Sequence, residues 1–412
     1  MTQNDKNEIR TDVESGGAQP VKKRYVVLDA LRGFAILGIC LANFQEFSLY
    51  SFQSEAVHAA MPSYAVDGVV GFLLRMFVDG KFYTIFSILF GIGFSIIIAN
   101  AKRRGANGMR IFYRRMTVLL IIGLLHLWFL WSGDILALYA LMGMLLPLAY
   151  GLSDKKLLWL SGALLLLPLV VDTLRLLSGV DPSDQLYAWW WQAAYGQGID
   201  EDHFARWLVD TSSYADMHRF LVQGAVERMW EFVTGNRYYK VLGLFVLGLW
   251  IGKRRLYADL KAHECLLRRV FAVGVVMGLP LSVVYAVGSD VKPLQTLVYT
   301  LSVYPMGLAY MSGLALLYMR SEEAGVWRFF AYPGRLALSN YLLQSVLGVV
   351  LFYGIGLAWG AEMGLGCVCL VALGVYVAEV LMSALWLRRF RYGLIEWLWR
   401  MLTYGRFLDI RK

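Results

Sequence analysis

The chain has 412 residues, of which 58% are hydrophobic and only 17% are charged, against about a quarter in an ordinary soluble domain. This composition excludes a soluble enzyme, a disordered chain and a disulfide scaffold. Apolar runs recur from Tyr25 to Trp386, and a membrane span needs about 20 apolar residues. The sequence therefore predicts a polytopic membrane protein of the all-α class.

Ten membrane-spanning helices are predicted, in two groups of five separated by a long polar insertion. They cover residues 25–48, 81–100, 116–132, 134–152, 157–178, 238–252, 270–288, 295–318, 336–358 and 364–387. Residues 66–79 are too few to cross and include Arg75, so this segment is expected to lie at the outer surface or to re-enter the membrane. The expected domains are a disordered cytoplasmic tail (1–24), a first five-helix half (25–178), an extracytoplasmic insertion (179–237), a second half (238–404) and a short tail (405–412).

The formal charge of +9 follows this topology. With the amino terminus in the cytoplasm, 29 of the 39 Lys and Arg residues fall in the inner segments, and the short outer segments hold only Lys292. Cytoplasmic loops carry such an excess, so both termini are expected in the cytoplasm. Because topology accounts for the basic residues, nucleic-acid binding is not expected.

Two segments outside the predicted spans have distinctive compositions. The insertion 179–237 holds nine acidic residues and four arginines, a net charge of −5, and is rich in Trp and Tyr. Its aromatic residues predict an interfacial belt, with a sugar-binding platform as the alternative. Near the carboxy terminus, Leu394, Trp397, Leu398 and Met401 share one helical face with basic residues beside it, which predicts an amphipathic helix on the inner leaflet.

Polar residues inside the first predicted span are the first candidate site, because such residues are costly in a membrane. Asp29 and Arg32 are three residues apart and are expected to pair near the inner end. Asn43 lies eleven residues beyond Arg32, about three turns outward on a similar face. Either these residues form a structural ion pair and an interhelical hydrogen bond, or Arg32 holds an anionic phosphate at the inner mouth.

The second candidate site lies at the tight outer turn between the third and fourth predicted spans. His126 is about 10 Å inside the outer end, and Asp134 begins the following span, where an acid can cap the helix. The hairpin brings Asp134 back toward His126, so the carboxylate can orient the imidazole for base catalysis. The structural alternative is a helix-capping aspartate and a histidine bonded to a neighbouring helix.

The third candidate site opens the ninth predicted span. Asn340 and Gln344 are four residues apart and point the same way, with Ser345 beside them. Two amides on one face suit either a polar cavity or a clamp between helices. No metal site is expected, because the four cysteines lack zinc-like spacing with histidines.

Several blocks together resemble the YeiB family of bacterial inner-membrane proteins. In the first half these blocks are RYVVLDALRGFAILGICLANF, GKFYTIFSILFGIGF and YRRMTVLLIIGLLHLWFLWSGDILALYALMG. PGRLALSNYLLQSVLGVVLFYGIGL and FRYGLIEWLWRMLTYG resemble that family's carboxy-terminal domain of unknown function 418. The resemblance runs from about Arg24 to Tyr404 and implies a location in the bacterial plasma membrane.

The YeiB family is in turn similar to heparan-α-glucosaminide N-acetyltransferase and other transmembrane acyltransferases, which share the Asp-x-x-Arg-Gly pattern found here at Asp29, Arg32 and Gly33. Those proteins take an acyl group from cytosolic acyl-CoA and deliver it across the membrane. The glucosaminide enzyme has a histidine in the loop after its first span. His58 lies in the corresponding loop, but its spacing differs and the following tryptophan is missing, so His126 is ranked first.

The resemblance implies transfer of an acetyl or other short acyl group to an extracytoplasmic acceptor. Catalysis is assigned to His126 and Asp134, with His58 as the alternative base. The expected donor contacts are Arg32, Asp29, Asn43, Lys81, Asn340, Gln344 and Ser345. The acidic insertion suits an amino sugar or similar acceptor, and a homodimer is compatible with this function. The alternatives are a transporter or channel for a small solute and a noncatalytic scaffold.

Overall fold

The computed structural model describes residues 25–412, and the expected tail at residues 1–24 lies outside them. The described chain is helical, with no strand. Its long helices are α1 (Val26–Phe47), α4 (Lys81–Arg103), α5 (Gly108–Phe129), α7 (Asp154–Ser178), α12 (Arg237–Arg254), α13 (Glu264–Val287), α14 (Lys292–Arg320) and α17 (Leu365–Arg389). Shorter helices are α2 (Glu55–Ala60), α3 (Tyr64–Phe77), α6 (Leu136–Leu145), α15 (Gly325–Arg335), α16 (Ala337–Phe352) and α18 (Leu394–Tyr404).

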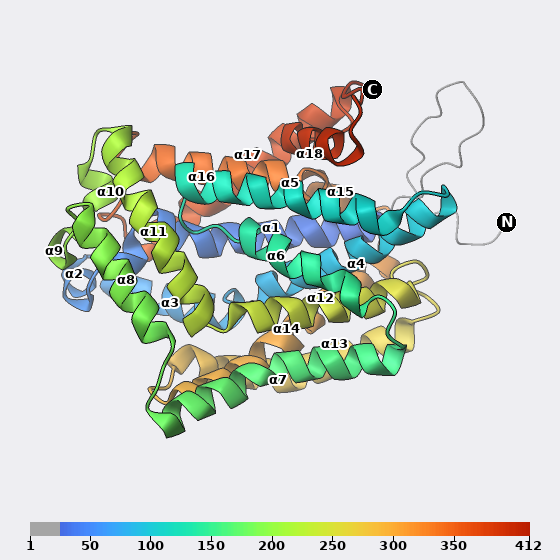
Figure 1. The fold of residues 1–412 in the computed structure, drawn as a ribbon, viewed down its shortest axis with the longest axis horizontal. Helices are drawn as coiled ribbons and strands as arrows, with labels where there is room; N and C mark the ends of the chain where they lie inside the picture. Colours follow the sequence, from blue (N-terminus) through green and yellow to red (C-terminus); the bar gives the residue numbers. More distant parts are fainter. Residues whose placement is uncertain (1–24) are drawn as a thin grey trace.

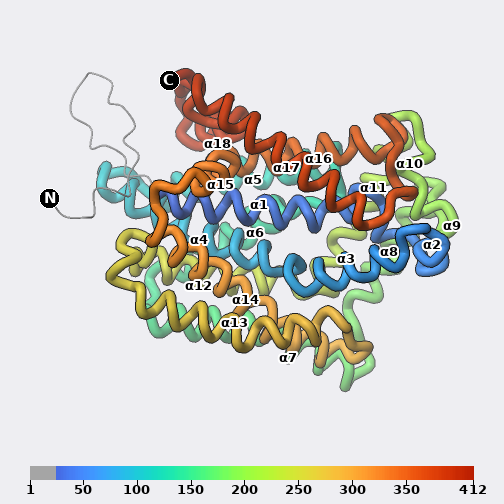
Figure 2. Tube along the Cα trace, turned by 180° about the vertical axis from the view of Figure 1, so that it is seen from behind, coloured from blue at the N-terminus to red at the C-terminus, as the bar shows by residue number. Residues whose placement is uncertain are grey.

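Most long helices run along one direction of the molecule (Figure 1). The start of α1 and helix α18 lie at one end, here called the α18 end. The insertion helices α8 (Ser183–Gly196), α9 (Glu201–Phe204), α10 (Trp207–Asp210) and α11 (Tyr214–Thr234) lie at the opposite end, called the insertion end (Figure 2). Helices from both sides of the insertion interlock: α12 packs between α4 and α7, and α1 packs against α15, α16 and α17.

Seven helical segments among residues 25–412 are long and apolar enough to cross a membrane, or eight if the bent pair α15–α16 is one span. The seven are α1, α3 together with α4, α5, α7, α13, α14 and α17. Ten spans remain a prediction, because the apolar helix Leu136–Ala149 is short and α12 begins with the charged residues Arg237 and Lys240. Helix α3, which was expected to lie at the outer surface or to re-enter the membrane, continues toward α4 and packs against α13 and α17.

The predicted span 336–358 corresponds to α16, which begins at Ala337, ends at Phe352 and is preceded by the shorter helix α15. Helices α15 and α16 meet at Leu336 with a bend of 77°. The Glu396 side chain, from α18, caps the start of α16: its Oε1 accepts hydrogen bonds from the backbone N–H groups of Leu338 (2.7 Å) and Ser339 (3.1 Å). A carboxylate at a helix amino terminus satisfies otherwise unpaired donors and complements the helix dipole. The break therefore has a specific partner in α18.

The aromatic residues of the insertion pack largely against one another. Trp190 is buried, stacks on Trp191 and Trp230 at centroid distances of 5.1 and 5.2 Å, and donates its indole N–H to Gln223. This packing joins α8 to α11. Trp190 is thus part of the core of the insertion, whereas Tyr187, Trp189, Tyr195 and Tyr214 are exposed, and the interfacial belt and the sugar platform stay predictions for them.

Two glycines set the closest helix crossing in the bundle. A Cβ atom at Gly33 of α1 would lie 1.8 Å from the carbonyl oxygen of Phe330, and one at Gly334 of α15 would lie 1.8 Å from that of Asp29. The two backbones therefore touch directly, as small residues allow at helix interfaces. This gives the glycine of the Asp-x-x-Arg-Gly pattern a structural role.

We predict that Gly33→Ala lowers thermal stability strongly, because the added methyl group must push α1 away from α15, an overpacking that costs about 1–3 kcal/mol or more. Gly374→Ala is the matched control, because this glycine also lies within a long helix and a Cβ there meets nothing within 4 Å. Thermal unfolding of the purified protein in detergent measures both. Equal melting temperatures for the two variants would contradict the proposed contact.

Candidate functional site

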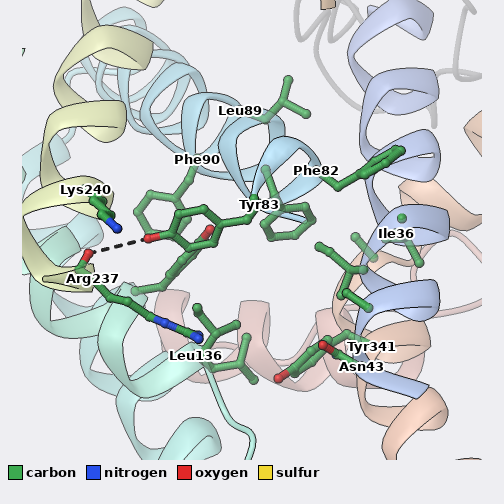
Figure 3. A pocket seen from close by; sticks show the side chains of 18 of the residues that line it. Ile36, Asn43, Phe82, Tyr83, Leu89, Phe90, Leu136, Arg237, Lys240 and Tyr341 are labelled. Atoms are coloured by element: carbon green, nitrogen blue, oxygen red, sulfur yellow. Dashed lines mark hydrogen bonds between the residues drawn. The ribbon is translucent and has the colours of Figure 1, made fainter. Parts of the chain in front are cut away.

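A cavity of about 760 Å³ lies among helices α1, α4, α12, α14 and α16 and reaches residues at both ends of the bundle. Figure 3 shows part of its lining, in which aromatic rings such as Tyr83, Phe90 and Tyr341 lie beside polar groups. Nine basic and five acidic residues line it, so the lining carries a net positive charge. Charged groups inside a helical bundle usually face such a cavity or pair with one another.

The basic lining residues form two main groups. The α18-side arginine group comprises Arg32, Arg115, Arg335 and Arg400, and the insertion-side basic group comprises Arg228, Arg237, Lys240 and Lys292. Sequence analysis identified only Arg32 of these eight as a site residue. Lys240 lay within a predicted span without an assigned role, and the others were assigned to topology or to the net charge of the insertion, because nothing in the sequence shows that they face a common space.

The α18-side arginine group is held by local contacts. Arg32 Nη1 lies 2.8 Å from Asp29 Oδ1, so the predicted i,i+3 pair is present. The guanidinium of Arg115 lies 3.4 Å from the ring centroid of Trp399, and that of Arg400 lies 4.7 Å from the ring of Tyr392. Arginine stacked on an aromatic ring keeps its donor edges available for an anion. This end of the cavity is therefore suited to phosphate groups.

Arg228 anchors the insertion over the other end of the cavity. It comes from α11, donates to the carbonyl of Ser132 at 2.9 Å, and forms ion pairs with Glu231 and, at 3.3 Å, with Glu46. Burial opposes its charge, but the carboxylates of Glu231 and Glu46 raise the pKa of Arg228 above its usual value. Arg228 is thus a paired structural cation. The sequence signal that was missed is Glu231 three residues later on the same helix face.

The predicted pair of His126 and Asp134 is present, and a third residue completes it. His126 Nδ1 lies 2.9 Å from Asp134 Oδ1, and Nε2 lies 2.8 Å from Ser345 Oγ. Asp134 Oδ2 also accepts the backbone N–H of Ala137 at 2.8 Å, so it caps α6 as expected. All three side chains are buried, at 1–3% exposure. The contact joins α5, α6 and α16.

The imidazole of His126 does not line the cavity, but its neighbour Tyr341 does. Their rings lie 5.3 Å apart between centroids. The hydroxyl proton of Tyr341 has no acceptor among the described residues. Figure 3 shows Tyr341 close to Asn43 of α1, which also lines the cavity. Asn43 thus shares the cavity with Arg32, as predicted from their spacing.

Asn340 and Gln344 both point from α16 toward α17. Asn340 donates to Ser383 Oγ at 3.0 Å, and Gln344 donates to Glu379 at 2.8 Å. Gln344 also lines the cavity, whereas Asn340 does not. The amide pair is therefore a clamp between helices, with one edge at the cavity. Glu379 was not assigned a role from the sequence, because its partner lies 35 residues away.

Two further candidates lie away from the cavity. His58, in α2, stacks on Tyr50 at 4.1 Å, and its Nε2 lies 3.0 Å from the Tyr50 carbonyl oxygen. Lys81, at the start of α4, is fully buried and donates to the carbonyl of Arg75 at 2.7 Å. The His58 contact holds α2 against the preceding turn at Tyr50, and the Lys81 contact holds the turn between α3 and α4.

We predict that Asp134→Ala lowers the free energy of unfolding by about 2–4 kcal/mol, because it removes the cap of α6 and leaves His126 Nδ1 without its buried partner. Asp154→Ala is the matched control. Asp154 also begins a helix, but its pair with Arg254 is partly exposed, at 33% and 58% of the two side chains, so its loss costs about 0–1 kcal/mol. Denaturant unfolding in detergent compares them, and equal losses would contradict the buried role of Asp134.

Comparisons with known proteins agree with the resemblance inferred from the sequence. Residues 251–406 match the family model described as protein of unknown function DUF418. The chain is 29% identical over 399 residues to the uncharacterised protein YxaH of Bacillus subtilis, covering 95% of this chain and 96% of that protein. It is 28% identical over 401 residues to the uncharacterised protein YeiB of Escherichia coli, covering 92% and 96%. The chain is thus similar to YxaH and YeiB along more than nine tenths of its length and carries a DUF418 region at residues 251–406.

Proposed function

We propose that this protein is a membrane-embedded acyltransferase that moves an acetyl or other short acyl group from cytosolic acyl-CoA to an extracytoplasmic acceptor. The observation that carries the proposal is the cavity, which extends from the α18-side arginine group to the insertion-side basic group and passes Tyr341, the neighbour of His126. A donor and an acceptor entering from opposite faces need such a shared space. The similarity of the first helix to transmembrane acyltransferases points the same way.

The proposed topology has ten spans in the bacterial plasma membrane, with both termini in the cytoplasm. In support, the start of α1 and helix α18 lie at one end of the molecule and the insertion lies at the other (Figure 1). The α18 end then faces the cytoplasm, in agreement with the excess of basic residues in the inner loops. Helices α6 and α12 are the two additional spans in this topology.

We predict that single cysteines at Lys261 and Arg406 are labelled only after permeabilisation of intact cells, and that a cysteine at Arg219 is labelled without it. All three positions are exposed, and the native cysteines are first replaced by serine. The measurement is modification by a membrane-impermeant maleimide. If the cysteines at positions 261 and 219 were both labelled from the same side of the membrane, the result would contradict the ten-span topology.

The proposed donor site is the α18-side arginine group. CoA carries several phosphates, and guanidinium groups bind phosphate oxygens through paired hydrogen bonds. Arg115 and Arg400 stack on aromatic rings and form no ion pair with a carboxylate of residues 25–412, so their hydrogen-bond donors are available to an anion. The uncharged arm of CoA would then extend along the aromatic middle of the cavity and place the thioester beside Tyr341.

In the proposed reaction, the acceptor hydroxyl or amine attacks the thioester carbonyl. The new acyl bond forms, the C–S bond breaks, and the acceptor proton ends on the CoA thiol. His126, oriented by Asp134, is the proposed base. Because its Nε2 is bonded to Ser345 and the imidazole does not line the cavity, this role requires Ser345 to release Nε2 and the Tyr341 ring to turn aside.

A transporter of an organic anion is the alternative function, and one observation favours it. The hydrogen-bonded group of His126, Asp134 and Ser345 does not line the cavity. The lining therefore contains charged side chains but not the proposed catalytic base. Transport predicts flux of an anion into proteoliposomes without acyl-CoA, and flux that survives His126→Asn in a folded protein. Acyl transfer predicts no such flux and loss of transfer in this variant.

We predict saturable binding of acetyl-CoA that Arg400→Gln weakens by about 10-fold, because a charge-assisted hydrogen bond contributes roughly 1.5 kcal/mol. Arg406→Gln is the matched control, since Arg406 is exposed near the same end and does not line the cavity. Calorimetric titration into detergent-purified protein measures both, with ATP as the competing anion. No binding near millimolar acetyl-CoA, or equal weakening by both substitutions, would contradict the donor site.

A further inference from the structure

Two cations at the insertion end of the cavity have no counter-ion. Arg237 and Lys240 belong to the first turn of α12 and line the cavity, and no ion pair or side-chain hydrogen bond joins either of them to another described residue. Figure 3 shows the Lys240 side chain directed toward Tyr83 and Phe90, and the Arg237 side chain extending toward Leu136. We propose that Arg237 and Lys240 bind the phosphate group of an organic phosphate ester. The further assignment of this phosphate ester as the acyl acceptor rests on the proposed acyl transfer.

The neighbouring acids already have partners. Asp172 Oδ1 accepts from Asn236 at 2.8 Å and lies 3.3 Å from Arg175, and its Oδ2 accepts from Thr296 at 2.6 Å. Glu46 pairs with Arg228, and Asp79 accepts the hydroxyl proton of Tyr285. An ionised group inside a bundle needs a partner or water. Among the described residues no carboxylate is left to pair with Arg237 and Lys240, so water or an anion from outside completes them, and an organic phosphate is the anion that we propose.

The local fold fixes these two cations before a ligand arrives. Asn236 adopts a left-handed conformation (φ 51°) that turns the chain from α11 into α12, and its side chain is anchored on Asp172. The Tyr83 hydroxyl donates to the carbonyl of Arg237 at 3.5 Å, drawn as a dashed line in Figure 3. Lys240 lies three residues later on the same face, with its ammonium 4.1 Å from the ring centroid of Tyr299.

The side chains around this pair indicate an ester rather than inorganic phosphate. A guanidinium and an ammonium together match a phosphate group in charge and in donors. The rings of Tyr83, Phe90 and Tyr299 line the adjoining space and can cover an organic portion. A phosphate ester is an anion, whereas the net negative charge of the insertion suggested a cationic amino sugar as the acceptor. The acids responsible for that charge include Asp200, Glu201 and Asp202, none of which lines the cavity.

The test is calorimetric titration of the full chain in detergent with two phosphate esters. Glycerol 3-phosphate represents a soluble ester, and dihexanoyl phosphatidic acid represents a lipid headgroup. Glycerol and glucosamine are the neutral and cationic controls. We expect at least one ester to bind saturably, and the double substitution Arg237→Gln with Lys240→Gln to weaken it at least 10-fold. Binding of only the lipid, or of both esters, identifies the source and supports the site.

The control variant is Arg219→Gln, since Arg219 lies in the insertion but not at the cavity. Lys240→Gln alone is the milder variant if the double variant does not fold. Ester binding that is unchanged by the substitutions at Arg237 and Lys240, absence of ester binding, or preferential binding of glucosamine would overturn the proposal. Acetyl-CoA is titrated in parallel. If it does not bind while an ester still depends on Arg237 and Lys240, acyl transfer fails and the phosphate site survives. If the double substitution weakens acetyl-CoA binding as much as it weakens ester binding, Arg237 and Lys240 also hold the donor, and their assignment to the acceptor fails.

Discussion

The cost of an ionised side chain among apolar helices governs how this structure is arranged. Each charge must be paired, stacked on an aromatic ring or left facing the cavity. Asp29 and Arg32 pair within one helix, and Arg228 pairs with Glu231 and with Glu46 of a different helix. Arg115, Arg400, Arg237 and Lys240 face the cavity and form no ion pair with a carboxylate among the described residues. The net positive charge of the cavity therefore comes from the cations that have no carboxylate partner, and this charge favours anionic ligands.

Helix α16 is the element on which the buried polar contacts converge. One of its faces meets α5 through Ser345 and His126, and the other meets α17 through Gln344 and Glu379. Its start is fixed by Glu396 of α18 at the bend from α15. A rotation of α16 would break these contacts together, because they lie within two turns of one helix. The break at Leu336 thus sets the orientation of a helix that lines the cavity and also supports His126.

Contacts that are local in sequence were predictable, and those between distant helices were not. The pair of Asp29 and Arg32 follows from helix periodicity, and the approach of His126 to Asp134 follows from the tight turn between two apolar segments. The bond from His126 to Ser345 joins residues 219 positions apart, so no local pattern predicts it. The break between α15 and α16 had a signal in Pro333, which removes a helical hydrogen-bond donor. The cavity-facing role of Arg237 depends on the left-handed turn at Asn236, which residue spacing does not reveal.

The distribution of charge along the cavity bears on how two anionic substrates can share it. Arg32 and Asn43 both line the cavity from α1, and eleven residues of helix separate them by about 16 Å. Between the basic groups the lining is largely aromatic and uncharged, with Phe86, Phe90, Tyr139 and Tyr341. Two anionic groups held at opposite ends repel each other weakly over such a distance in a hydrated cavity. Their uncharged reacting portions are then the parts that meet in the middle, beside Tyr341 and His126. Cations at both ends and rings between them are therefore better suited to joining two substrates than to passing one ion, because a single ion would have to leave one basic group and cross an apolar section.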